Sequence, residues 1–144
     1  MGTAMINGKR KCRCQAIIIQ DDSVLFLKQL GKKTSQPYWM LPGGALLEGE
    51  TIIDGISREM EEEIGAAINI EKHIQSDVLD TEYYEYSTFL CTLNEGSNIM
   101  LGEENNSQIL EIEWIPVSDI LSGQVENKIK QVEPNIHSII RKLV

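Results

Sequence analysis

Short runs rich in β-branched and aromatic residues, bounded by turn residues, recur along this chain and predict a β-sheet. The segments with this pattern are Cys12–Ile19, Val24–Gln29, Trp39–Leu41, Ala67–Ile74, Asp77–Leu93 and Ile109–Val117. The first two flank Asp21 and Asp22, which favours a hairpin turn between them. In the third segment, Trp39 is expected in the hydrophobic core.

A period of three to four residues replaces this alternation between residues 51 and 65 and predicts an amphipathic helix. The apolar residues at this spacing, expected to form its buried stripe, are Ile53, Ile56, Met60 and Ile64. Thr51, with Asp54 after it, is the expected N-cap, and Gly65 is the expected left-handed C-cap. Two shorter helices are predicted at Ser118–Leu121 and Pro134–Leu143.

Length and composition indicate a single folded domain. A chain of 144 residues with 42% hydrophobic and 24% charged residues can bury a sizeable core. Met1–Lys11 is polar and unpatterned, so we expect a flexible N-terminal segment over residues 1–11 and one domain over residues 12–144. Cys12, Cys14 and Cys91 are odd in number, which favours reduced thiols, and the first two would share one face of a strand.

The charge balance restricts the partners of the protein. A net charge of −9 argues against binding to a nucleic-acid backbone, because that affinity needs clustered lysine and arginine. No apolar run approaches the roughly eighteen residues that a membrane span needs, and no signal peptide is visible. We therefore expect a cytoplasmic protein with no nucleic-acid partner and no membrane association. A monomer and a homodimer are both compatible with the sequence.

Acidic residues crowd one side of the predicted helix. Glu59, Glu62 and Glu63 span an arc of about 100°. The last turns of a helix disfavour negative charge by roughly 0.3–1 kcal/mol for each side chain. One interpretation is an acidic, solvated surface. The other is a divalent cation that neutralises the cluster, and carboxylate oxygens favour magnesium or manganese. The spacing of an EF-hand calcium loop is missing.

The residues around this cluster form a recognisable pattern. Its fixed positions are Gly44, Glu50, Arg58, Glu59, Met60, Glu62, Glu63 and Gly65. This arrangement resembles the Nudix box, the signature of the Nudix hydrolases, at every charged and glycine position. The chain departs from the box at Ala66, where a larger aliphatic residue is usual, and at Leu47, where many members carry a glutamate.

The resemblance implies a fold and an activity. The fold would be an α+β Nudix fold, an α/β/α sandwich with a central mixed sheet. The enzyme would be a pyrophosphohydrolase that cleaves a nucleoside diphosphate linked to another group, with Mg²⁺ or Mn²⁺ as cofactor. Because a diphosphate repels hydroxide, metal ions must screen its charge and lower the pKa of the attacking water.

The resemblance also assigns roles to residues of the box. Glu59 and Glu63 would bind the metal directly, and Glu62 would be a further ligand or the group that takes the proton. A backbone carbonyl of the Gly43-Gly44 pair would be another ligand, since a glycine turn lets the backbone approach a metal or phosphate closely. An ordinary tight turn is the alternative for this pair. Crowding raises the proton affinity of at least one carboxylate, but the identity of the general base stays open.

Arg58 is expected to support the site. Its guanidinium could hold Glu50 by a two-pronged hydrogen bond and so keep the acids in place. The alternative is a surface ion pair between Arg58 and Asp54 or Glu62.

Residues outside the box are less sharply indicated as substrate contacts. Lys32, next to Lys33, could meet phosphates, although solvated loop charges are the commoner case. Tyr83 lies roughly where dinucleoside polyphosphate hydrolases of the family place a tyrosine. Alternation puts Tyr84 and Tyr86 on one face of the strand and Tyr83 on the other. The alternative is that these tyrosines are half-buried residues of the sheet.

Two later positions bear on catalysis and substrate. By resemblance, Glu104 in the polar loop 94–107 would complete the metal shell or act as the base, with a solvated side chain as the alternative. Val132 stands where MutT-type members carry an asparagine ahead of a Glu-Pro pair, which argues against close MutT specificity. A nucleoside triphosphate, a nucleotide sugar and a dinucleoside polyphosphate all remain as substrates. The alternative function is a non-catalytic Nudix-fold sensor that binds a nucleotide.

Overall fold

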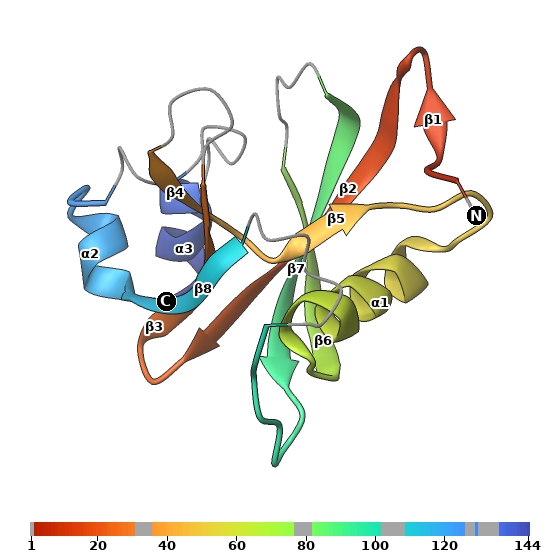
Figure 1. Ribbon diagram of the computed structural model, residues 1–144. Helices are drawn as coiled ribbons and strands as arrows, with labels where there is room; N and C mark the ends of the chain where they lie inside the picture. Colours follow the sequence, from red (N-terminus) through yellow and green to blue (C-terminus); the bar gives the residue numbers. More distant parts are fainter. Residues whose placement is uncertain (1, 31–35, 77–81, 102–108, 126–128, 130–135) are drawn as a thin grey trace.

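The computed structural model describes residues 2–30, 36–76, 82–101, 109–125, 129 and 136–144 (Figure 1). Its strands are β1 (Met5–Ile6), β2 (Lys9–Gln20), β3 (Ser23–Leu30), β4 (Pro37–Met40), β5 (Gly43–Ala45), β6 (Ile68–Ser76), β7 (Tyr83–Leu93) and β8 (Ile109–Pro116). Its helices are α1 (Ile52–Ile64), α2 (Val117–Leu121) and α3 (Ile136–Leu143). Lys32, Glu104 and Val132 lie outside the described residues.

The described strands form an eight-stranded mixed sheet with the central order β4-β3-β2-β7-β6. β2 and β7 pair in parallel, and β2 pairs in antiparallel fashion with both β5 and β3. Asp21 and Asp22 join β2 to β3 with φ angles of 50° and 61°, as a tight hairpin turn requires. The predicted hairpin and the predicted α+β class are therefore confirmed.

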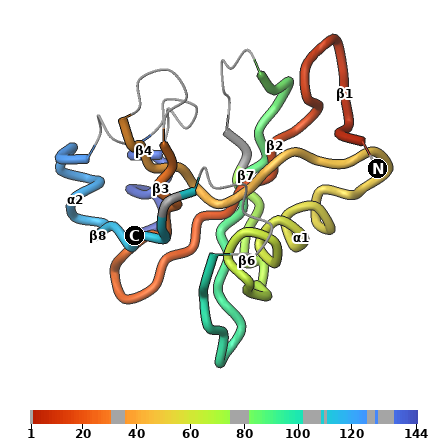
Figure 2. Tube along the Cα trace, in the orientation of Figure 1, coloured from red at the N-terminus to blue at the C-terminus, as the bar shows by residue number. Residues whose placement is uncertain are grey.

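Alternate residues of β2 point into two hydrophobic cores on opposite faces of the sheet. Cys12 and Cys14 pack in the same core as Ile56 of α1. Ile17 packs in the other core, with Ile140 of α3. α1 and α3 accordingly lie on different sides of the sheet (Figure 2), which is the expected sandwich.

The N-terminal segment differs from the flexible start expected over residues 1–11. Met5 pairs with Arg10 in β1 and β2. The backbone N–H of Ala4 donates to the carbonyl of Leu46 at 2.9 Å, and the N–H of Lys11 donates to the carbonyl of Ala4 at 2.8 Å. Backbone hydrogen bonds order this segment, and such bonds leave no hydrophobic pattern in the sequence.

Two positions test the predicted core. Trp39 is partly buried and packs against the core around α3, as expected. Ile53, predicted in the buried stripe of α1, is instead 50% exposed. The residues of α1 that are buried are Gly55, Ile56, Met60 and Ile64. The helical period was right, but the first turn of α1 packs against the core through Ile52.

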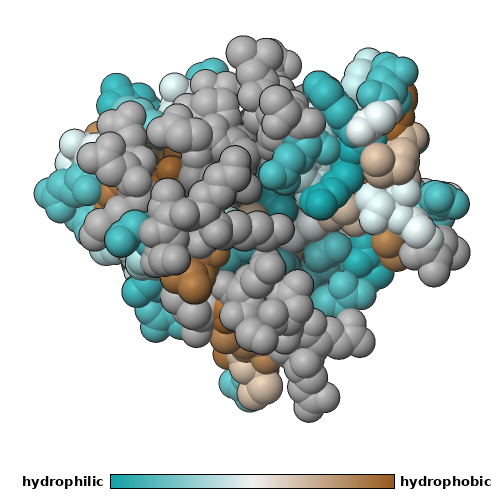
Figure 3. Space-filling view, turned by 45° about the horizontal axis from the view of Figure 1, so that its top comes forward, coloured by the Kyte–Doolittle hydropathy of each residue, from teal (hydrophilic) through white to brown (hydrophobic). Residues whose placement is uncertain are grey.

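On the face shown in Figure 3, the coloured residues are mostly hydrophilic, and the hydrophobic ones occupy small, separate areas. Among the helices in the described ranges, none has the length and apolar character that crossing a bilayer requires. Cys12, Cys14 and Cys91 are buried free thiols, as the odd number of cysteines favoured.

Candidate functional site

The caps of α1 fix the helix that carries the acidic cluster. The side chain of Thr51 accepts a hydrogen bond from the backbone N–H of Asp54 at 3.1 Å. At the other end, Gly65 adopts the left-handed conformation with φ 64°, and its N–H donates to the carbonyl of Glu61. Both predicted caps are confirmed. Between them, the buried stripe and the acidic arc are adjacent, so Glu59 and Glu63 project toward β5 beside the hydrophobic core.

The backbone of β5 lies directly against these two carboxylates. The N–H of Gly43 donates to Oε1 of Glu63 at 2.6 Å. A Cβ atom on Gly44 would lie 2.5 Å from the carboxyl group of Glu59, and one on Gly43 would lie 2.1 Å from the carbonyl oxygen of Cys14. A Cβ atom on Gly43 would overlap the backbone of β2, and one on Gly44 would displace the carboxyl group of Glu59, so this close packing favours glycine at both positions.

Arg58 joins the loop before α1 to the acids on α1. Its Nε donates to Oε2 of Glu50 at 2.7 Å and its Nη2 donates to Oε1 at 3.0 Å, so the predicted two-pronged clamp is present. Nη2 also donates to the carbonyl of Ala45 in β5 at 3.0 Å. The remaining nitrogen, Nη1, donates to Glu59 at 2.9 Å and to Glu62 at 3.1 Å. Arg58 therefore forms both the clamp and the alternative ion pair with Glu62.

The charges of the site differ in how well they are balanced. The hydrogen bond from Arg58 holds the pKa of Glu50 below its ordinary value. Burial raises the pKa of Glu63 to about 8 and raises the pKa of Glu59, although Arg13 and Arg58 oppose the shift at Glu59 and Arg13 opposes it at Glu63. The nearby arginines thus leave the negative charge on Glu59 and Glu63 under-compensated.

This donor set fits a hard divalent cation. Two under-compensated carboxylates beside glycine backbone offer oxygen ligands of the kind that magnesium and manganese favour. Within the described part of the chain, no three His, Cys, Asp or Glu side chains converge closely enough to hold an ion. Glu59 and Glu62 both accept hydrogen bonds from Nη1 of Arg58. Because Glu59 and Glu63 are the two more deeply buried acids beside β5, they are the carboxylates that would hold the metal, with a carbonyl of the Gly43-Gly44 pair.

The tyrosines of β7 are arranged differently from simple alternation. Tyr83 and Tyr86 are both buried and their rings meet edge to face, with centroids 5.3 Å apart, whereas Tyr84 is 52% exposed. The hydroxyl of Tyr83 accepts a hydrogen bond from Nη1 of Arg10 at 3.0 Å. The prediction that Tyr83 and Tyr86 lie on opposite faces of the strand is wrong, because their rings are in contact. Tyr83 is the first residue of β7, and its side chain is buried.

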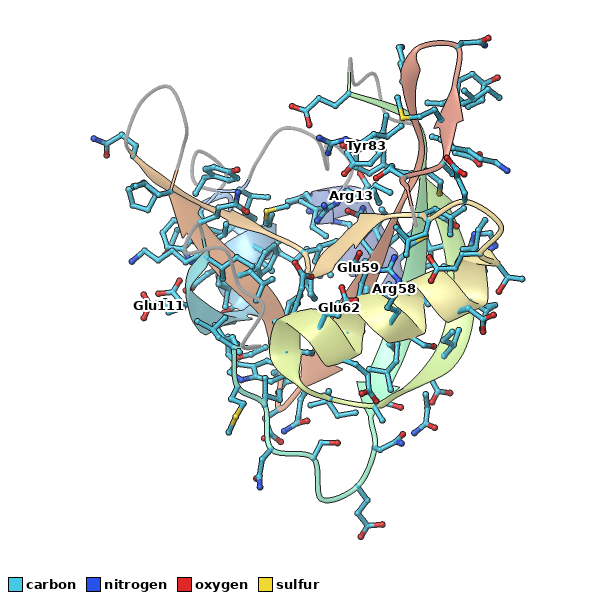
Figure 4. All side chains as sticks on the ribbon, turned by 45° about the vertical axis from the view of Figure 1, so that its right-hand side comes forward. Arg13, Arg58, Glu59, Glu62, Tyr83 and Glu111 are labelled. Carbon is cyan, nitrogen blue, oxygen red and sulfur yellow. The ribbon has the colours of Figure 1, made fainter. Side chains whose placement is uncertain are left out.

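Arg13, which lies behind the site, was not predicted from the sequence. Arg13 is 5% exposed, and Nη2 donates to the carbonyl of Leu41 at 2.8 Å. Figure 4 shows Arg58, Glu59 and Glu62 on the side of α1 that faces β5, and Arg13 on the other side of β5. The one available signal was a cationic residue between Cys12 and Cys14, in the middle of a strand that was otherwise expected to be buried.

Several known proteins are similar to this chain. A family model described as the NUDIX domain matches residues 11–137. Nudix hydrolase 7 of Arabidopsis thaliana is 29% identical over 121 residues, which cover 82% of this chain and 39% of that protein. The first curated relatives are much longer, since the matched part covers only 30–39% of each.

Solved structures share the fold at lower sequence identity. The E. coli ORF135 protein aligns with a TM-score of 0.71 and 14% identity, covering 97% of this chain and 95% of that one. A NUDIX hydrolase from Nitrosomonas europaea aligns with a TM-score of 0.70 and 20% identity, covering 92% of this chain and 70% of that one. The mixed sheet and the position of α1 are therefore those of a known fold.

Proposed function

Because this chain belongs to the NUDIX domain family, we propose that it hydrolyses a pyrophosphate bond in a nucleoside diphosphate linked to another group. The observation that carries the proposal is the pair Glu59 and Glu63, whose pKa values are raised by burial beside the glycine backbone of β5. A site that concentrates negative charge in this way needs a cation, and a diphosphate is a multiply anionic substrate that needs one too.

The residues of the site divide the work of hydrolysis. Glu59, Glu63 and a carbonyl of the Gly43-Gly44 pair hold magnesium or manganese. When bound, the metal lowers the pKa of the attacking water and offsets the charge of the phosphates. Glu62 is either a further ligand or the group that takes the proton from water. Arg58 keeps the acids in place through Glu50, the carbonyl of Ala45 and Glu59.

The substrate is a small nucleotide. Relatives and structural neighbours include an 8-oxo-dGDP phosphatase of Homo sapiens, a UDP-X diphosphatase and an ADP-ribose pyrophosphatase of Streptococcus suis. The compounds in these names share a phosphoanhydride bond next to a nucleoside and differ in the group beyond that bond. That bond is therefore what we assign to this chain, and the group on the far side stays open among triphosphates, nucleotide sugars and dinucleoside polyphosphates.

A panel of such compounds tests the proposal. The purified chain is incubated with each compound and Mg²⁺ or Mn²⁺, and the phosphate-containing products are separated by anion-exchange chromatography. We expect metal-dependent cleavage at a phosphoanhydride of at least one compound. Tight binding of a nucleotide without cleavage of any compound would point instead to a nucleotide sensor. EDTA-treated protein and the Glu63→Gln variant are the controls for contaminating hydrolases.

A further inference from the structure

A chain of buried hydrogen bonds runs behind the acidic site, across three parts of the sheet. Nε2 of Gln15 donates to the hydroxyl of Thr88 in β7 at 3.0 Å. Oε1 of the same Gln15 accepts from Nε of Arg13 at 3.1 Å, and Nη2 of Arg13 donates to the carbonyl of Leu41 at 2.8 Å. Arg13, Gln15 and Thr88 are exposed by 5% or less. This chain of bonds connects β7 and β2 to the segment that joins β4 to β5.

A guanidinium at this depth is costly to desolvate, so its partners must compensate for the loss of water. The guanidinium donates to the side-chain oxygen of Gln15 and to the carbonyl of Leu41, and these two bonds hold it in a fixed orientation.

Through its hydrogen bond to the carbonyl of Leu41, Arg13 contacts the backbone segment that leads into the site. Leu41 lies two residues before Gly43, whose N–H donates to Glu63. β2 holds the same stretch through backbone pairing, because Gln15 pairs with Gly43 and Arg13 pairs with Ala45. A shift of the Leu41 carbonyl would move the Gly43 N–H away from the carboxylate.

We propose that Arg13 is a positioning residue of the metal site, which fixes the Leu41–Gly43 segment against Glu63 before a cation arrives. The inference rests on the proposed function, because it assigns Glu63 to the metal. This role requires the planar, forked guanidinium of arginine and not only its positive charge. A lysine would keep the charge but cannot donate to Gln15 and Leu41 with the same fixed geometry.

Manganese binding to the chain of 144 residues tests this role without any turnover. Isothermal titration calorimetry with Mn²⁺ alone is run on the native chain, Arg13→Lys and Arg13→Met, with unfolding by urea measured in parallel. Arg10→Lys is the matched control, because Arg10 lies on the same strand and bonds to Tyr83 instead. We expect both Arg13 variants to bind Mn²⁺ about 10–100-fold more weakly, the range for residues that orient metal ligands, and Arg10→Lys to bind within about twofold of the native chain.

A second readout separates positioning from a general loss of stability. In Arg13→Lys, the amide proton of Gly43 should exchange with solvent at least about tenfold faster than in the native chain, while Arg10→Lys leaves its rate unchanged. Native Mn²⁺ affinity in Arg13→Lys, or tighter binding in Arg13→Met, overturns the inference. Should Arg13→Met not fold, Arg13→Lys decides the question alone. Absence of Mn²⁺ binding by the native chain would overturn the proposed function first.

Discussion

The two sides of the acidic run on α1 differ although they carry the same residue type. On the inner side, Glu59 is 12% exposed and Glu63 is bonded to the backbone of β5. On the outer side, Glu62 is 41% exposed and accepts a hydrogen bond from Nη1 of Arg58, and Glu61 is exposed. Burial raises the pKa values of the two inner acids.

The difference shows that the number of glutamates does not make the site. An exposed carboxylate is compensated by water and salt, whereas an inner carboxylate depends on what the protein places beside it. Here that is the Gly43 N–H, Arg58 and the more distant Arg13. Electrostatic demand for a cation therefore concentrates on Glu59 and Glu63, and the outer acids add a diffuse negative field.

The sharpest test of this comparison replaces one inner acid in one variant and one outer acid in another. Glu63→Gln should lower kcat by about 10²–10⁴-fold, because it removes a charged group that acts on the metal and the attacking water. Glu61→Gln, an exposed neighbour on the same helix, should stay within about twofold. Steady-state hydrolysis of the best compound from the panel measures both, with circular dichroism to check the fold. A Glu63→Gln enzyme with near-native kcat removes Glu63 from the site.

Arg58 bridges the two sides, so its replacement should have the next largest effect. Arg58→Lys keeps a positive charge but loses the two-pronged bond to Glu50 and the bond to Ala45. We expect kcat to fall about 10–100-fold, since the inner acids lose their fixed orientation. Arg141→Lys, in the last turn of α3, is the matched control. Equal kcat for the two variants would mean that Arg58 is a surface ion pair.

The parts of the site that the sequence predicted are those specified locally. The caps of α1, the glycine pair and the arc of glutamates all follow from spacing along one short segment, because helical geometry fixes which residues are neighbours. The clamp between Arg58 and Glu50 was predicted for the same reason, with the Nudix resemblance as a second guide. Predictions at Lys32, Glu104 and Val132 stay predictions, since they lie outside the described residues.

The parts that the sequence did not predict depend on contacts between distant segments. Arg13 gains its position from Leu41 and Gln15, and its place between Cys12 and Cys14 in the sequence does not reveal these partners. Tyr83 turns inward because Arg10 and Tyr86 surround its ring. The pairing of β1 with β2 likewise depends on the backbone and not on a side-chain pattern. The carbonyl partner of Arg13 and the hydrogen-bond partner of Tyr83 are far away in the sequence, so no local pattern identifies them.

A third prediction concerns pH in the absence of metal. The pKa of Glu63 is raised to about 8 in the folded protein, from an ordinary value of 4.5. The folded protein therefore keeps a proton that the unfolded chain has lost, and this contribution to stability is complete below about pH 4.5 and lost as the pH rises through about 8. The Glu63→Gln variant has no carboxyl group at this position, so its stability lacks this dependence on pH.

Urea unfolding in EDTA at pH 5.5 and 8.5 measures this difference. Between these values the native chain should lose at least about 1.4 kcal/mol more than Glu63→Gln, the free energy of a tenfold change in proton affinity. Glu61→Gln should follow the native chain. Parallel losses in native and Glu63→Gln protein would show that the inner carboxylate is as well compensated as the outer ones.

The smallest effect is expected at an apolar position, where the same contrast between inner and outer sides applies. Ile53 is 50% exposed although it follows the period of the stripe, whereas Ile56 is fully buried. Ile53→Ala should change the free energy of unfolding by less than about 0.5 kcal/mol, because little apolar surface leaves contact and alanine favours the helix. Ile56→Ala should cost about 2–5 kcal/mol, from the lost burial and the cavity. Urea unfolding compares the two, and a cost at Ile53 approaching that at Ile56 would mean that Ile53 is buried in the core.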